Sequence, residues 1–421
     1  MRIGLVIWAL HSKGGLERVG TKLAWAMHER GHEVAIFYQD LDQSTQQAYP
    51  LPPDLAQVNL KLRDGASLSA ARQKLLAIRP DVLCAMFSWD ALLWFPALLN
   101  GTGIPLLISE HNVPRIIEEE RWNRYERLAC MAGADAIHLL SSAFLDSLPP
   151  FLRERAVVIP NPAEAPVAVD QSRENAPRKR LLAVGRLQDE HKQFSLILQA
   201  VALLAPTFPD WDLRICGDGQ DRQRYESMIA ALGLAGRVSL LGRVEDMDAE
   251  YAAAHLFCIP SRYEGFGLVV VEAQRFGLPV VGFAECNGVN EIVMHGENGI
   301  LAPEMNARCL AASLKPLLTS ASLRQQMGVR GQASLARFEP QKIYAQWEEI
   351  LHKTAQAKGN TRLNFAEQSA EEATLTSLRE ILHRRHPFVR PACAAAEREK
   401  RALAATLTQA IELLRRHNSI V

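Results

Sequence analysis

The chain has 421 residues, 48% of them apolar, and its 47 lysines and arginines balance 47 aspartates and glutamates. This length exceeds one ordinary hydrophobic core and predicts two domains with additional segments. The balanced charge argues against a nucleic-acid-binding protein, because such proteins carry a basic excess that neutralises phosphates.

Cysteine usage and hydropathy predict a cytoplasmic protein. The seven cysteines include no C-x-x-C pair, and their odd number leaves one unpaired in any disulfide scheme, which favours reduced thiols. The apolar run at 3–10 has the length of a signal-peptide core, but charged residues on a helical pattern follow it between 13 and 22, so we expect no export. The apolar run at 92–99 is too short to span a bilayer.

The N-terminal part alternates strand and helix patterns in the order of a parallel α/β sheet. A strand at "RIGLVIW", a glycine turn, and an amphipathic helix that stops at Gly31 precede a second strand at "HEVAIFY". Further strands are expected at "DVLCAMF", "IPLLIS" and "AIHLLS". We assign residues 1–162 to this first domain.

A second alternation follows a linker at 163–180, which is rich in proline, alanine and charge. Within 181–340 we predict strands at "RLLAVG", "DLRICG", "RVSLLG", "LFCIPS" and "PVVGF", and helices at about 194–204 and 221–232. Such continuous apolar runs are typical of parallel strands that are covered on both faces. The sequence therefore predicts an α/β protein with two doubly wound, Rossmann-like domains that face each other across a cleft.

The C-terminal part predicts helices. Residues 341–358 predict one long helix, and the mildly basic tail at 359–421 holds two amphipathic patterns split by "HPFVRP". The tail is interpreted either as a solvated helical hairpin or as a segment that docks on a membrane surface or a partner.

The stretch "SRYEGFGLVVVEAQRFGLPVV" at 261–281 predicts a binding loop after a strand. Its valines mildly favour a strand, but the spacing to Pro279 leaves room for one short element, and we predict a helix that ends at Gly277. Four backbone N–H groups at the helix start would form an anion site, those of Gly265, Phe266, Gly267 and Leu268. Glu272 could then accept hydrogen bonds from a vicinal diol such as ribose, and Glu264 from hydroxyls of a group attached to the anion. A diphosphate between a ribose and a polyhydroxylated group is a nucleotide sugar.

This stretch resembles the E-x7-E signature of the retaining glycosyltransferases of family 4, which have the GT-B fold. Four more segments resemble motifs of that family, in register over about residues 1–355: Gly14 and Gly15 with Glu17, "SEHN" with His111, "VGRLQDEHKQF" with Arg186 and Lys192, and "GDG" at 217–219. In that fold the helix at 341–358 crosses back to the first domain.

The resemblance implies that Arg186 and Lys192 neutralise the donor diphosphate and stabilise it as it leaves, in place of a metal ion. It implies that the backbone at Gly15 approaches the same phosphates, where a Cβ would be in the way.

For the sugar and nucleoside, the resemblance implies that Glu272 accepts from the ribose hydroxyls. Glu264 would accept from sugar hydroxyls beside the anomeric centre, and His111 would face the transferred sugar. Arg243 falls where the family's backbone contacts the base.

We expect no metal cofactor. The D-x-D patterns at 40–42 and 246–248 match the metal motif of the other glycosyltransferase architecture, but they lie beside turns, and a metal would duplicate Arg186 and Lys192. Two positions depart from the family pattern: Pro162 stiffens the interdomain segment, and Gln193 replaces a small residue after Lys192.

The resemblance implies transfer of a hexose or N-acetylhexosamine, from a UDP-sugar, to a cell-surface glycan or glycolipid acceptor, as in lipopolysaccharide, O-antigen or capsule synthesis. The expected place is the cytoplasmic face of the inner membrane, with peripheral contact. The alternatives are a nucleotide-sugar epimerase of double-Rossmann fold and a non-catalytic nucleotide-sugar-binding scaffold. Product analysis without acceptor discriminates the first, and donor hydrolysis the second.

Overall fold

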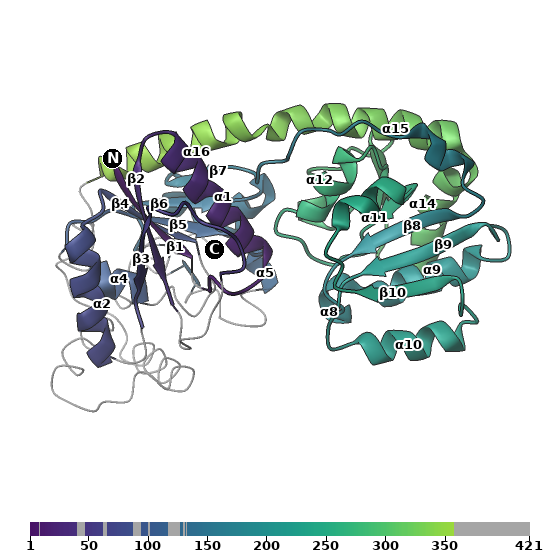
Figure 1. Cartoon of the computed structure of the whole chain (residues 1–421), viewed down its shortest axis with the longest axis horizontal. Helices are drawn as coiled ribbons and strands as arrows, with labels where there is room; N and C mark the ends of the chain where they lie inside the picture. The colour runs from purple at the N-terminus through teal and green to yellow at the C-terminus, as the bar shows by residue number, and fades with distance from the viewer. Residues whose placement is uncertain are drawn as a thin grey trace. The chain divides into compact units, whose positions relative to one another are not determined.

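The computed structural model describes residues 1–7, 9–39, 47–61, 65–86, 94–99, 102–116, 127–128, 131 and 133–357. The tail predicted at 359–421 and the aspartates at 40 and 42 lie outside the described residues. The chain divides into two units, which are described separately (Figure 1). Unit 1 comprises Met1–Ile159 with the segment from Tyr344 onward, and unit 2 comprises Pro160–Ile343.

Unit 1 is built around a seven-stranded parallel sheet of order β3-β2-β1-β4-β5-β6-β7. Its elements are β1 (Arg2–Ile7), α1 (Gly15–Glu29), β2 (Glu33–Tyr38), β3 (Ala56–Asn59), α2 (Gly65–Ile78), β4 (Val82–Met86), α4 (Trp94–Leu99), β5 (Leu106–Glu110), α5 (Pro114–Ile116), β6 (Ala136–Leu139), the 3₁₀ helix η2 (Ser142–Ser147), α7 (Pro150–Arg153) and β7 (Ala156–Val158). The central strands β4 and β5 are buried along their whole length, which explains their apolar sequences.

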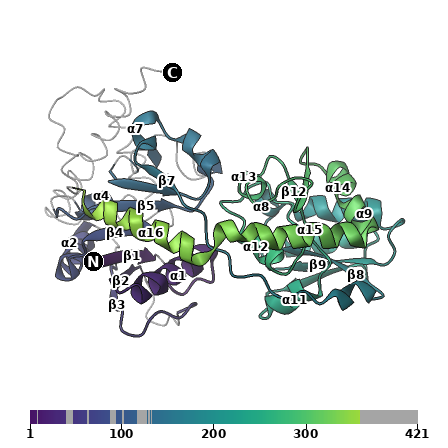
Figure 2. The same ribbon diagram turned by 90° about the horizontal axis from the view of Figure 1, so that it is seen from above.

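Unit 2 repeats this plan with a six-stranded parallel sheet of order β10-β9-β8-β11-β12-β13. Its elements are η3 (Gln171–Asn175), β8 (Lys179–Val184), α8 (Asp189–Lys192), α9 (Phe194–Leu204), β9 (Trp211–Cys216), α10 (Arg222–Ala231), β10 (Val238–Gly242), α11 (Met247–Ala253), β11 (Leu256–Cys258), α12 (Leu268–Arg275), β12 (Val280–Phe283), α13 (Asn287–Asn290), β13 (Gly299–Ala302), α14 (Ala307–Thr319), α15 (Ala321–Ser334) and η4 (Leu335–Phe338). Helix α9 packs against α10 and also against α14, and α12 packs against α15; α9 and α14 lie side by side in Figure 2.

The valine-rich segment after "RYEGFG" is a helix. In α12, Val270 and Val271 are buried, so packing against the core outweighs their β propensity. The helix is short because Phe276 ends it and Gly277 follows with a φ of 63°, a left-handed conformation that glycine adopts readily.

Residues 160–178 lie against unit 2 and are held there by hydrogen bonds. The N–H of Val167 donates to the carbonyl of Arg275 at 3.1 Å, and the guanidinium of Arg173 donates to the carbonyl of Phe276 at 3.2 Å. Within the same segment Glu174 forms an ion pair with Arg324. These contacts make the segment part of the surface of unit 2.

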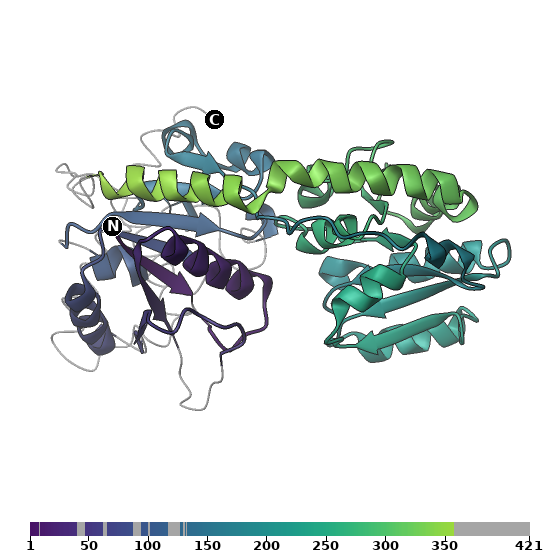
Figure 3. The same ribbon diagram turned by 45° about the horizontal axis from the view of Figure 1, so that its top comes forward.

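The last described helix, α16 (Pro340–Ala355), contributes its part from Tyr344 onward to unit 1. The ring of Trp347 lies 4.3 Å from the ring of His138 in β6. The Nε of Arg30, just after α1, lies 3.3 Å from an Oε of Glu348, so this part of α16 lies beside α1 (Figures 1 and 3). Among the described helices, none is both long and apolar enough to cross a membrane.

Candidate functional site

In unit 2 the candidate site lies at the carboxyl ends of β8 and β11, the two strands at which the strand order reverses. Loops that follow parallel strands at such a point form the usual ligand crevice of a doubly wound sheet. The loop after β8 leads through Gly185 and Arg186 into α8, which ends at Lys192. The loop after β11 holds Ser261 and Glu264 and leads into α12.

The loop after β8 is fixed by close backbone packing against the loop after β9. The N–H of Gly185 donates to the carbonyl of Cys216 at 3.0 Å, and a Cβ on Gly217 would lie 1.9 Å from the carbonyl oxygen of Gly185. Gly217 also has a φ of 139°. The "GDG" turn therefore needs glycine both for its conformation and for this close approach.

Lys192 and Glu264 meet in unit 2, although 72 residues separate them in the chain. The Nζ of Lys192 lies 2.5 Å from Oε1 of Glu264, and the hydroxyl of Ser261 donates to the same oxygen at 2.6 Å. The two charged side chains are 22% and 12% exposed. Oε2 of Glu264 receives no hydrogen bond from any described residue, which leaves one carboxylate oxygen available to a ligand.

The main chain at Glu264 packs directly against α13. A Cβ on Gly288 would lie 2.3 Å from the carbonyl oxygen of Glu264, so this position tolerates only glycine without a shift of the loop. Cys286, just before α13, is buried as a free thiol. Burial, together with the nearby charge of Glu264, raises its pKa to about 12, so this thiol is not a nucleophile at neutral pH.

The start of α12 offers backbone donors, as the sequence predicts. Gly267 is the N-cap with a φ of 83°, and no side chain caps the helix. The N–H groups of Gly265, Phe266 and Gly267 donate to no described residue. Phe266 is buried with its ring 5.4 Å from that of Phe338, so it anchors the loop, while Leu268 opens the helix.

Glu272 lies in the second turn of α12 and is oriented by a tyrosine that the sequence reasoning missed. The hydroxyl of Tyr251 in α11 donates to Oε2 of Glu272 at 2.9 Å. Tyr251 is buried and stacks on Phe276, with ring centroids 5.6 Å apart. No sequence spacing points to this contact, because it joins two different helices.

Two exposed arginines flank the same edge of the unit 2 sheet. Arg186 follows β8, and Arg243 follows β10. Neither guanidinium has a hydrogen-bond or ion-pair partner in the part of the chain that the structure describes. Both are therefore cations available to an anionic ligand, although the structure brings neither into contact with Lys192 or Glu264.

Asp189 organises the turn that carries Lys192, and the sequence reasoning missed it. Its Oδ1 accepts from the N–H of Ser195 at 2.9 Å and from the hydroxyl of Tyr225 at 2.8 Å. Gln193, the residue expected to disturb this turn, adopts a left-handed φ of 46° between α8 and α9. Glycine adopts that conformation without strain, so among small residues it is glycine that suits this position.

In unit 1 the glycine pair forms the start of α1. Gly14 is the N-cap in an extended conformation, and Gly15 is exposed as the first helical residue. A Cβ on Gly14 would lie 2.2 Å from Oε2 of Glu17, so the carboxyl of Glu17 folds back over the helix start. Burial raises the pKa of Glu17, while a hydrogen bond from its own backbone N–H opposes this shift.

His111 follows β5 and belongs to a hydrogen-bonded chain of three side chains. The hydroxyl of Ser109 lies 2.8 Å from Nε2 of His111 and 2.8 Å from Nδ1 of His138. Nε2 of His138 donates to the carbonyl of Ile159 at 2.7 Å, which makes its Nδ1 the acceptor of the serine proton. Ser109 then accepts from Nε2 of His111, so Nδ1 of His111 is left as an acceptor.

The imidazoles of His111 and His138 are both neutral at physiological pH. Burial lowers the pKa of His138 to about 4, although the hydrogen bond to Ile159 opposes the shift. Burial, with a smaller contribution from His138, lowers the pKa of His111 to about 3. Neutral His111 can accept a hydrogen bond from a hydroxyl but cannot supply a positive charge.

A buried ion pair, which no sequence pattern indicates, supports the end of β5. Nε and Nη2 of Arg127 donate to the two carboxylate oxygens of Glu110 at 2.8 and 2.6 Å, and both side chains are fully buried. Nη2 also donates to the hydroxyl of Ser147 at 2.9 Å. This bidentate pair fixes the residue immediately before His111.

The second D-x-D pattern has a structural explanation. Asp246 is the N-cap of α11 and accepts from the N–H of Ala249 at 3.0 Å, while Asp248 lies 3.2 Å from a guanidinium nitrogen of Arg275. Both carboxylates are thus engaged by the protein itself. The first D-x-D pattern falls on residues outside the described ranges.

Two family models match the chain and together span both units. The model described as "Glycosyltransferase Family 4" matches residues 13–165, and the model described as "Glycosyl transferases group 1" matches residues 166–334. The boundary between the two matches falls within the segment that follows unit 1.

Similar proteins cover nearly the same length. An uncharacterized glycosyltransferase of Haemophilus influenzae is 27% identical over 365 residues, which is 83% of this chain and 99% of that protein. A GalNAc-α-(1→4)-GalNAc-α-(1→3)-diNAcBac-PP-undecaprenol α-1,4-N-acetyl-D-galactosaminyltransferase of Campylobacter jejuni is 26% identical over 371 residues, or 85% of this chain and 100% of that enzyme. Among solved structures, Anabaena HepE in complex with UDP and glucose matches with a TM-score of 0.69 and 20% identity, covering 84% of this chain and 100% of that one. The last likeness concerns the fold alone.

Proposed function

We propose, on the premise that the chain belongs to the GT-B glycosyltransferases of family 4, that it transfers a hexose or N-acetylhexosamine from a UDP-sugar with retention of configuration. The observation that carries this proposal is the Lys192–Glu264 pair beside the unsatisfied N–H groups at the start of α12. A cation and backbone N–H donors suit the diphosphate of a nucleotide sugar, and a carboxylate that accepts hydrogen bonds suits its hydroxyls; all of them lie at one edge of the unit 2 sheet.

In the proposed complex Lys192 and Arg186 contact the diphosphate. Arg186 is exposed and has no partner among the described residues, so it binds an anion without giving up another contact. Lys192 exchanges its contact with Glu264 for one with a phosphate oxygen. Both cations act most strongly when the diphosphate leaves, because its negative charge increases in the transition state.

The carboxylates orient the two ends of the donor. Oε2 of Glu264 accepts from a sugar hydroxyl near the anomeric carbon, and Glu272, held by Tyr251, accepts from the ribose. In unit 1, Nδ1 of neutral His111 accepts from a hydroxyl of the transferred sugar. Gly14 and Gly15 bring the start of α1 to the phosphates, and the backbone beside Arg243 contacts the base.

The reaction proposed for this site needs no general base from the protein. The bond from the anomeric carbon to the diphosphate oxygen breaks while the acceptor oxygen bonds to the same face of that carbon. The acceptor hydroxyl gives its proton to the departing phosphate oxygen, and the nucleoside diphosphate leaves. Because Lys192 and Arg186 supply the compensating charge, we propose that transfer requires no metal ion.

The acceptor proposed is a glycan or a lipid-linked glycan of the cell surface, as in lipopolysaccharide, O-antigen or capsule synthesis. The Campylobacter jejuni relative, whose name describes transfer to an undecaprenol-linked glycan, supports this class of acceptor. Such an acceptor places the enzyme at the cytoplasmic face of the inner membrane, where it would bind peripherally.

The product made from α-linked UDP-sugars tests this function. Released UDP identifies the accepted donor, and NMR of the product with undecaprenyl-linked glycan acceptors is expected to show an α-linkage. A β-linkage would overturn the mechanism, and an epimerised nucleotide sugar without acceptor would replace the transferase proposal by an epimerase. Glu264→Gln keeps the shape but removes the anionic acceptor, so it should lower donor turnover sharply. Glu285→Gln, an exposed carboxylate of the same unit, is the matched control.

A further inference from the structure

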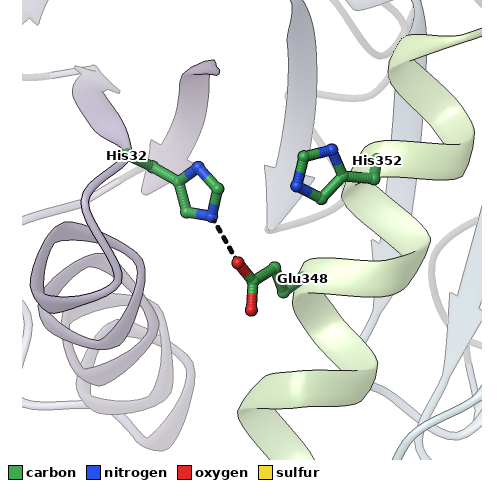
Figure 4. A group of neighbouring side chains, drawn as sticks. All are labelled: His32, Glu348 and His352. Carbon is green, nitrogen blue, oxygen red and sulfur yellow. Dashed lines mark hydrogen bonds and ion pairs between the residues drawn. The ribbon is translucent and has the colours of Figure 1, made fainter.

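Three potential metal ligands meet in unit 1, and none of them belongs to the sequence motifs. His32 lies in the turn between α1 and β2, and Glu348 and His352 lie one helical turn apart on α16. Figure 4 shows their three side chains turned toward one another. One ligand atom of each residue lies within 4.8 Å of the other two. Residues four apart on a helix share one face, so the two α16 ligands approach His32 together.

We propose that His32, Glu348 and His352 bind a Zn²⁺ ion that fastens α16 to the N-terminal sheet of unit 1. Two imidazoles and one carboxylate form a borderline donor set that suits zinc, with the fourth position taken by water. The metal would join residues 316 positions apart, so it would add stability to the packed state of α16.

The geometry needs only a small adjustment to hold an ion. Ligand atoms around tetrahedral zinc lie about 3.4 Å apart, given metal–ligand distances of about 2.1 Å. Nε2 of His32 already lies 2.9 Å from Oε1 of Glu348. The remaining adjustment falls on His352, which is exposed and whose ring has no hydrogen-bond partner among the described residues. Its side chain can therefore turn toward the ion without breaking a hydrogen bond, and its ring already lies edge-on to that of His32, with ring centroids 5.5 Å apart.

The surroundings orient the other two ligands, the buried His32 and the partly exposed Glu348. Nε of Arg30 lies 3.3 Å from Oε2 of Glu348, which leaves Oε1 facing His32 and favours one-oxygen coordination. His32 is held by its N–H, which donates to the carbonyl of Met27 at 3.1 Å. The N-terminal nitrogen lies 3.4 Å from Nδ1 of His32, so Nε2 is the ring nitrogen that faces Glu348.

The charges around the proposed site oppose Zn²⁺ binding in two ways. Zn²⁺ must displace the proton that lies between His32 and Glu348, and it must tolerate the positive charge of Arg30 on the outer carboxylate oxygen. These costs predict a moderate affinity, in contrast to an all-cysteine structural site. None of the three ligands belongs to the proposed transfer site, so the ion is expected to affect stability and not the chemical step.

The test measures Zn²⁺ binding to the full chain after treatment with EDTA and removal of the chelator. Competition with a chromophoric chelator gives the affinity of the wild type, of His352→Ala and of Glu348→Gln. His28→Ala is the matched control, because His28 also lies near a carboxylate, 3.6 Å from Asp54, but belongs to no group of three potential ligands among the described residues. We expect the His28 variant to equal the wild type, and the other two variants to bind zinc at least tenfold more weakly.

Two further measurements separate this site from other zinc-binding residues of the chain. Zn²⁺ should raise the melting temperature of the wild type by a few degrees and leave that of His352→Ala unchanged. Co²⁺ in place of zinc should give visible absorption bands that His352→Ala abolishes. Equal zinc affinity and an equal shift of the melting temperature in wild type and His352→Ala would overturn the proposal.

Discussion

Replacing Lys192 by alanine tests whether the charge of this side chain serves catalysis or folding stability. Lys192 is 22% exposed and pairs with Glu264 at 2.5 Å, and Glu264 keeps its hydrogen bond from Ser261 when the lysine is removed. The loss of this partly buried pair should therefore cost only about 1 kcal/mol of folding stability. By contrast, removal of a charge that stabilises the leaving diphosphate costs about 3 kcal/mol in the transition state, a rate loss on the order of a hundredfold.

The measurement is single-turnover transfer with saturating UDP-sugar, read as UDP release, for Lys192→Ala and for a matched lysine. Lys179, at the other end of β8, also pairs with a carboxylate, with its Nζ 3.1 Å from Asp210, and Lys179→Ala should retain wild-type turnover. Combining Lys192→Ala with Glu264→Gln should lower the rate by less than the product of the two single effects, because both residues act on one bound donor.

A Lys192→Ala turnover within about threefold of the wild type would refute this reasoning and make Lys192 a surface lysine. An equal loss in Lys179→Ala would also refute it, because the effect would then follow from disturbing β8. A melting temperature that falls far more in the Lys192 variant than in the Lys179 variant would assign the pair a structural role.

Three further predictions concern the buried ion pair of unit 1, the buried His138 and the role of metal ions. Arg127→Met should destabilise unit 1 by about 3–5 kcal/mol in urea unfolding, since Glu110 is left charged and buried; a cost below about 1 kcal/mol would contradict this. Burial lowers the folded pKa of His138 to about 4, so between about pH 6.5 and pH 4 the unfolded chain binds a proton that the folded chain does not bind. Stability therefore falls as the pH is lowered through this range, by up to about 1.4 kcal/mol per pH unit. His138→Phe should lose this contribution and keep the similar one of His111, whose pKa burial lowers to about 3, so an unchanged slope would exclude His138 as a source. Transferase activity should survive EDTA, and complete loss with rescue by Mn²⁺ or Mg²⁺ would exclude metal-independent transfer.

The prediction of two parallel α/β folds from the sequence is confirmed, because buried parallel strands have continuous apolar sequences. The helix predicted at 194–204 is α9 with the same limits, and each predicted strand of the second domain is present. The helix after Gly267 is also confirmed against the β propensity of its valines. These features depend on residues near one another in the chain, where period and spacing carry the information.

The contacts that build the candidate site were only partly predictable. The motifs identify Lys192 and Glu264, but not that the two side chains meet across 72 residues. Ser261 could have been found, because it lies three residues before Glu264 in the same loop. Tyr251 and Arg127 could not, since their partners lie on other elements and one sequence contains no signal for such pairs.

The ion pair between Lys192 and Glu264 has a consequence for donor choice under the proposed function. In the free protein each charge is compensated by the other, with Ser261 as a second donor to the carboxylate. A nucleoside diphosphate alone attracts Lys192 but offers Glu264 nothing in return, so the carboxylate loses its strongest donor. A nucleotide sugar replaces both contacts, because its diphosphate binds the lysine and its hydroxyls donate to the carboxylate. The pair therefore favours the intact donor over the nucleotide product, which helps the product to leave once the sugar has been transferred.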